Sequence, residues 1–208
     1  MSEQEATSAD EQSDQTSVPS APVDAPPVPS ELPEPIVPLA WLIGTWVGVG
    51  LGQYPTIEDF RFGQELRFWS DGRPFLYYQS LSWIVDDEGN KVRQALSETG
   101  YWRPVEDKLQ VLMTYSNGYS ELMLGENTVT SIENAVIKGA RAELKSDVIV
   151  GVEGSKEYTA SERMYGLNNE DLFWAFDMAA VGQPMQNHLA AQLKRASYIG
   201  DPQHFQTD

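Results

Sequence analysis

The sequence predicts an all-β protein, an antiparallel up-and-down barrel of roughly ten strands. From residue 38 onward, apolar and polar residues alternate with period two in runs of similar length, as half-buried strands do. Short turns rich in Gly, Asp and Asn join these runs, and Asp71-Gly72 is a strong hairpin signal. Closure of such a set of strands into a barrel removes the exposed sheet edges.

A barrel of about ten strands is wider than an eight-stranded barrel, whose interior side chains can just fill. We therefore expect an internal cavity that holds a small, largely apolar molecule. This is the first functional inference, and it comes from the number of strands alone.

Residues 1–37 differ from the rest of the chain in composition. This segment has no Lys, Arg or aromatic residue, eight acidic residues, and seven prolines in its second half. It cannot bury enough apolar surface to offset the entropy lost on ordering, so we predict a disordered acidic tail. Docking onto a basic partner is the functional alternative for the tail. The barrel domain is predicted over residues 38–200, and residues 201–208 form a short C-terminal tail.

Composition excludes several classes of protein. The chain has no cysteine, which excludes disulfides, thiolate metal sites and cysteine nucleophiles. A net charge of −17 without a basic stripe argues against a nucleic-acid partner. No secretory signal and no apolar stretch long enough for a membrane span is apparent. These features predict a cytoplasmic protein with no membrane partner.

The elements follow in order after Pro38. The apolar run 39–43 predicts a short helical turn that closes one end of the core. The segment 44–53 reads as the first strand. Further strands are predicted over 60–69, 75–85, 94–103, 109–115, 119–124, 129–132, 135–144, 157–167 and 172–179. The last segment, 185–197, fits a helix and a strand equally, because its apolar residues satisfy both periods.

The first strand is unusual in its glycines. Period two places Gly44, Trp46, Gly48, Gly50 and Gly52 on one face and the apolar residues of 45–51 on the other. Glycine weakens a strand, so the bare face indicates either a sharp bend or the close approach of another group. The residues leave open which face points inward. A dinucleotide-binding loop is excluded because Gln53 stands where the third glycine of that motif belongs.

Catalytic chemistry has few candidate residues. No Ser lies in a G-x-S-x-G elbow, and two distant histidines without cysteine make a poor zinc site. His204 lies in the polar C-terminal tail. His188 lies in the apolar last element, where a structural role and a ligand role both remain open. A haem needs only one protein donor, and a neutral imidazole is a common one.

Two stretches resemble the signatures of the nitrobindin family. The first is G-x-W-x-G-x-G running into Tyr-Pro-Thr-Ile over residues 44–57, and the second is V-G-Q-P-M-Q-N-H-L over residues 181–189. The resemblance covers roughly residues 38–197. It implies a ten-stranded barrel, related in shape to fatty-acid-binding proteins, that holds ferric haem b in an apolar pocket.

The same resemblance assigns roles to three residues. His188 matches the proximal iron ligand and is therefore the expected metal-binding and catalytic residue; Thr56 and Lys156 match positions that contact the haem. The implied activity is that of a peroxynitrite isomerase, which converts peroxynitrite to nitrate, with nitric oxide as a second small-molecule ligand. A homodimer is compatible with the resemblance.

Two other functions remain open from the residues. The first is a fatty-acid or other lipid carrier without haem, in which Arg103 and Tyr115 would hold the lipid carboxylate. The second is a purely structural interaction protein, for which only the acidic tail offers support. Uptake of haem distinguishes the first of these functions from a haem protein.

Overall fold

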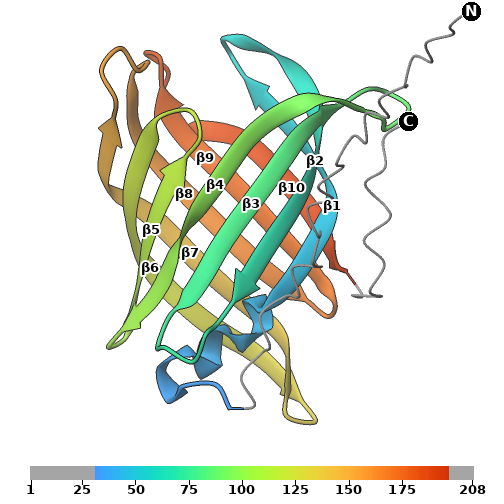
Figure 1. Cartoon of the computed structure of the whole chain (residues 1–208), viewed down its shortest axis with the longest axis vertical. Helices are drawn as coiled ribbons and strands as arrows, with labels where there is room; N and C mark the ends of the chain where they lie inside the picture. Colours follow the sequence, from blue (N-terminus) through green and yellow to red (C-terminus); the bar gives the residue numbers. More distant parts are fainter. Residues whose placement is uncertain (1–30, 197–208) are drawn as a thin grey trace, which may run out of the picture. The chain divides into compact units, whose positions relative to one another are not determined.

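A computed structural model describes residues 31–196. Its core is a closed barrel of ten antiparallel strands, each paired with its neighbours in sequence and closed by pairing of the first strand with the last (Figure 1). The predicted fold class is confirmed. The elements are η1 (Glu34–Leu42), β1 (Gly44–Tyr54), β2 (Ile57–Trp69), β3 (Leu76–Val85), β4 (Lys91–Val105), β5 (Lys108–Tyr115), β6 (Tyr119–Glu133), β7 (Val136–Gly151), β8 (Tyr158–Asn168), β9 (Asp171–Ala180) and β10 (Gln186–Arg195).

The structure merges two predicted strands and decides the one ambiguous segment. β6 is one long strand where two short ones were expected, because β7 pairs with it across the polar stretch 125–128 and supplies the ladder hydrogen bonds there. The ambiguous segment 185–197 contains strand β10, which pairs with both β1 and β9. Closure of the barrel requires a strand at this position. None of the helices in residues 31–196 is long and apolar enough to cross a bilayer.

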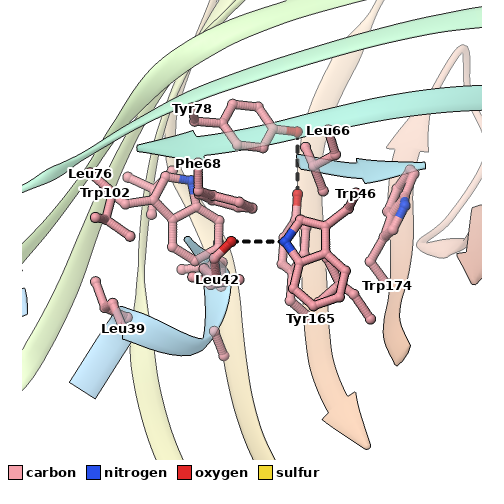
Figure 2. Close-up of a cluster of buried hydrophobic side chains, with 14 of the residues drawn as sticks. Leu39, Leu42, Trp46, Leu66, Phe68, Leu76, Tyr78, Trp102, Tyr165 and Trp174 are labelled. Atoms are coloured by element: carbon pink, nitrogen blue, oxygen red, sulfur yellow. Dashed lines mark hydrogen bonds between the residues drawn. The ribbon is translucent and has the colours of Figure 1, made fainter. Parts of the chain in front are cut away.

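η1 is a 3₁₀ helix that packs into one end of the barrel. It begins at Glu34, so it includes residues 34–37 that the composition grouped with the tail, and Ile36 is fully buried. The Trp41 indole N–H donates to Asn127 Oδ1 of β6 at 3.0 Å. The Trp46 indole N–H donates to the Leu42 carbonyl at 2.8 Å (Figure 2). Residues 1–30 of the predicted tail and the C-terminal segment 201–208 lie outside the described residues.

Large side chains fill the half of the barrel next to η1. Figure 2 shows indole, phenol and leucine side chains from η1 and several strands meeting there. The Tyr78 and Tyr165 hydroxyls lie 3.5 Å apart. Their burial is nearly complete, so this half is a packed hydrophobic core. Its principal members are Leu39, Leu42, Trp46, Leu66, Phe68, Leu76, Tyr78, Trp102 and Tyr165.

The glycine face of β1 points into the barrel. Trp46, Gly50 and Gly52 are buried, while Val49 and Leu51 lie on the outer wall with 57% and 66% of their surfaces exposed. This answers the question that the sequence left open.

The space above Gly50 and Gly52 is taken by two phenyl rings. A Cβ on Gly50 would collide with the ring of Phe62 and lie 2.6 Å from the Ala190 carbonyl oxygen, and a Cβ on Gly52 would collide with the ring of Phe60. The close approach that the bare strand indicated is therefore that of these rings at Gly50 and Gly52, and that of the β10 backbone at Gly48, where a Cβ would collide with the Gln192 carbonyl.

Candidate functional site

The end of the barrel away from η1 is hollow. Two adjoining cavities of about 260 and about 210 Å³ lie there. Both are lined by Leu96, Glu98, Asn117, His188 and Leu189, which make them neighbouring parts of one space. The predicted internal cavity is thus present. Its apolar lining also includes Phe60, Phe62, Phe176 and Met178.

A β-bulge turns His188 toward this space. In the ladder between β10 and β9, Asn187 pairs with Asp177 and Leu189 pairs with Phe176, so His188 is an extra residue without a partner on β9. A bulge of this kind re-aims a side chain that regular alternation would send to the other face. The imidazole packs edge-on against the Tyr54 ring, with the centroids 5.4 Å apart.

The His188 ring is oriented by a backbone carbonyl. Its Nδ1 lies 2.9 Å from the carbonyl oxygen of Gln53, which can only accept, so Nδ1 carries the proton. Nε2 therefore has a free lone pair. Burial lowers the pKa of His188, the Gln53 carbonyl partly opposes this shift, and the Arg163 charge adds to it. The ring is neutral near pH 7, which is the form that binds metal ions.

Thr56 and Lys156 lie at the rim of the same cavity. Thr56 occupies the turn between β1 and β2, and Lys156 occupies the loop between β7 and β8; both side chains are exposed. Both residues line the cavity that His188 lines. The Tyr119 hydroxyl donates to the Lys156 carbonyl and ties that loop to β6. The three predicted site residues, distant in sequence, thus surround one space.

The turn between β9 and β10 completes the rim. Val181 lines the cavity with φ of 47°, a left-handed conformation that is strained for a β-branched residue. Its N–H donates to the Glu157 carbonyl at 3.0 Å, and the Gly182 N–H donates to the Glu157 carboxylate at 2.8 Å. These bonds hold the turn against the loop that carries Lys156, so the two sides of the rim are connected.

Sequence reasoning missed a layer of buried charge below the cavity. Arg163 of β8 and Glu98 of β4 form an ion pair there. The Glu121 carboxylate accepts hydrogen bonds from Tyr115 at 2.5 Å, from Tyr158 at 3.2 Å and from Ser161. A charged residue at an inward position of an alternating strand is the signal that could have revealed this layer. In β8, regular alternation from Tyr158 would place Arg163 on the outer wall. The register shift between Tyr158 and Ala160 places it inside instead.

The carboxylate site suggested for a lipid carrier is not formed. Arg103 is exposed on the outer wall, whereas Tyr115 is buried inside the barrel. Alternation explains the difference, because the neighbouring Trp102 points inward and is fully buried. The two residues therefore do not face a common ligand.

Comparison with known proteins identifies the family. Residues 35–195 match the model of the THAP4-like, heme-binding beta-barrel domain. The chain belongs to this family. A peroxynitrite isomerase of a Nocardioides species is 45% identical over 173 residues, covering 81% of this chain and 99% of that protein. A ferric nitrobindin-like protein of Kineococcus radiotolerans is 36% identical, covering 82% of this chain and 98% of that protein.

A solved structure agrees with the assignment. The crystal structure of Rv2717c from M. tuberculosis superimposes with a TM-score of 0.73 at 33% sequence identity, covering 80% of this chain and all of that one. The resemblance to nitrobindins seen in the two sequence signatures is thereby confirmed.

The residues around the cavity fit a haem, the group that the family description names. A haem is commonly held by an imidazole with a free nitrogen, an apolar enclosure and polar groups at its carboxylate edge. His188 offers the first, the phenyl and leucine side chains offer the second, and the exposed rim with Lys156 offers the third. No cluster of three or more His, Cys, Asp or Glu side chains able to hold a bare metal ion occurs between residues 31 and 196.

Proposed function

We propose that this protein binds ferric haem b at the open end of the barrel and isomerises peroxynitrite to nitrate there. The observation that supports this most directly is the hydrogen bond from His188 Nδ1 to the Gln53 carbonyl, because it leaves Nε2 unprotonated on a ring that lines the cavity. Metal-binding histidines typically donate their other ring N–H to such an acceptor. His188 is the residue that would hold the haem iron, and it is the proposed catalytic residue.

A bound ferric haem would supply a Lewis-acidic iron able to bind the peroxynitrite anion. The chain's own residues do the rest. Phe60, Phe62 and Phe176 exclude water from the space beside His188. Lys156 places a positive charge at the rim, where it can pair with the carboxylates of haem b or attract an anionic substrate. Thr56 offers a hydroxyl at the same edge.

The lipid-carrier function is disfavoured by the interior charge. The buried cation nearest the cavity, Arg163, already has a carboxylate partner in Glu98. A fatty acid would have to displace that partner. Nitric oxide, being small and uncharged, would meet no such obstacle, and we include it as a second ligand of the same site.

Haem titration tests the ligand assignment. Purified protein titrated with haemin is expected to develop a Soret band, which His188→Ala should lose because it removes the imidazole that lines the cavity. His204→Ala, which removes the chain's other histidine, is the matched control and should bind as the unaltered protein does. An undiminished Soret band in His188→Ala would refute the assignment.

The activity needs its own measurement. Stopped-flow decay of peroxynitrite should accelerate in proportion to haem-loaded protein, with nitrate as the product. Equal rates for the haem-loaded protein and His188→Ala would count against catalysis at this site. The homodimer remains a prediction, which light scattering of the haem-loaded protein can check.

A further inference from the structure

The bulge at His188 needs something to hold it. An extra residue in one strand leaves its own backbone groups outside the ladder, and the strand could regain regular pairing by shifting one position. Such a shift would move side chains from one face of the sheet to the other. Next to the bulge, it would carry His188 from the cavity to the outer wall. The inward direction of the ring therefore depends on contacts that stabilise the bulge.

Asn187 makes those contacts on the outer wall. Its side-chain amide donates to Asp177 Oδ1 at 2.8 Å, across to the neighbouring strand β9. The same amide group lies 3.3 Å from the carbonyl oxygen of Leu189, on the other side of the bulge. Asn187 thus connects the residue before His188, the residue after it and the facing strand. Both Asn187 and Asp177 are half-buried, which limits competition from water.

The inner side of the bulge is held independently. The register of β1 shifts between Gly52 and Tyr54, and the carbonyl that accepts from His188 Nδ1 belongs to Gln53 at this irregularity. Tyr54 is anchored in turn, because its hydroxyl accepts from the Ala180 N–H at 2.9 Å. The imidazole is oriented from inside by β1, and its backbone is held from outside by Asn187.

We infer that Asn187 and Asp177 are positioning residues that fix the bulge from the outer wall and so aim His188 at the iron. The inference rests on the proposed role of His188 as axial ligand. Neither residue lines the cavity beside His188. Their effect passes entirely through the backbone of His188, which distinguishes them from the cavity-lining residues.

The same two strands provide a matched control. Gln192 of β10 donates its side-chain amide to Asp171 of β9 at 2.6 Å, also on the outer wall. This pair has the same chemistry as Asn187 and Asp177 but lies in regular ladder away from the bulge. Asn187→Ala and Asp177→Ala remove the contact under test, and Gln192→Ala removes the control contact. Asp177→Asn keeps an acceptor oxygen for the Asn187 amide.

The test uses haem-loaded full-length protein and two readouts other than turnover. Transfer of haem to excess apomyoglobin gives the dissociation rate, and resonance Raman spectra of the reduced protein report the iron–imidazole bond. We expect Asn187→Ala and Asp177→Ala to lose haem about tenfold faster or more, as outer partners of metal ligands typically do. Their iron–imidazole band should be shifted or broadened. Gln192→Ala and Asp177→Asn should stay close to the unaltered protein in both readouts.

The results separate the two levels of inference. Equal dissociation rates for Asn187→Ala and Gln192→Ala, with haem still lost from His188→Ala, would overturn the positioning role and leave the axial ligand intact. Haem retained by His188→Ala would overturn the proposed function instead. If Asn187→Ala does not fold, Asp177→Ala against Asp177→Asn decides the question. A double Asn187→Ala/Asp177→Ala variant should be no worse than Asn187→Ala alone, because Asn187→Ala already removes the bond to Asp177.

Discussion

Glu98 and Arg163 form a two-point ion pair inside the barrel, joining β4 to β8. Arg163 Nη2 donates to Glu98 Oε1 at 2.8 Å and Nη1 donates to Oε2 at 3.2 Å. Only 4% of Glu98 and 3% of Arg163 is exposed. Burial by itself lowers the pKa of Arg163, yet the Glu98 carboxylate keeps that pKa well above its ordinary value. The guanidinium therefore remains charged, and its partner is essential to its burial.

Removing one partner of this ion pair should lower the free energy of unfolding more than removing both partners. Glu98→Leu leaves a buried, unpaired guanidinium, and we expect a loss of ~3–5 kcal/mol in the free energy of unfolding. Glu98→Leu combined with Arg163→Met replaces the pair by apolar side chains and should recover most of that loss. Urea denaturation of the haem-free proteins measures both. Losses that simply add up in the double variant would show that the pair is not coupled.

The same pair should decide whether the cavity accepts a carboxylate. In Glu98→Ala, Arg163 and the hydroxyl of Tyr78, which donates to Glu98 at 2.5 Å, are freed as a ready carboxylate site. We expect octanoate to raise the melting temperature of Glu98→Ala but not that of the unaltered protein.

Arg163→Met introduced into Glu98→Ala is the control for that experiment and should abolish the octanoate response. Stabilisation of the unaltered protein by octanoate to the same extent would contradict the role of Glu98 and would favour a lipid carrier.

Gly52 should resist substitution because Phe60 lies against it. A Cβ at this position collides with the phenyl ring, so Gly52→Ala should lose ~1–3 kcal/mol of stability through overpacking. The ring borders the cavity beside His188, and its displacement into that cavity should weaken haem binding as well. Denaturation and haemin titration measure the two effects.

Leu51→Ala is the control for Gly52→Ala, since Leu51 lies on the outer wall and its truncation should change stability by no more than ~0.5 kcal/mol. Relief of the Gly52→Ala defect by Phe60→Leu would identify the ring as the cause. A defect that persists with the smaller side chain would locate the cause in the backbone of β1.

The hydroxyl of Tyr54 should contribute to the stability of the folded protein. This group accepts from the Ala180 N–H at 2.9 Å and lies 3.2 Å from the Ala180 carbonyl, so Tyr54→Phe leaves a buried N–H without a partner. We expect a cost of ~1–3 kcal/mol. Hydrogen exchange of the Ala180 amide should rise in parallel. Tyr101→Phe deletes a hydroxyl on the outer wall and should be near neutral; equal costs for the two variants would contradict the assigned bond.

Local patterns were sufficient for much of the fold. The alternation in 60–69 placed Phe62, Leu66 and Phe68 on one face, and all three are buried. The same patterns failed where pairing is irregular. Positions of bulges depend on the register of two strands, so the inward turn of His188 could not be read from period two. The ion pair of Glu98 and Arg163 joins residues 65 positions apart, which no short-range pattern reveals.

The glycine face of β1 illustrates the division between sequence and tertiary structure. The sequence by itself determined that β1 has one bare face, that the chain forms an all-β barrel, and that His188 is a histidine within a nitrobindin-like signature. Only the tertiary structure decided that the bare face points inward and that Phe60 and Phe62 occupy the space above it. The physical reason is that inside and outside exist only after β1 pairs with β10 and the barrel closes.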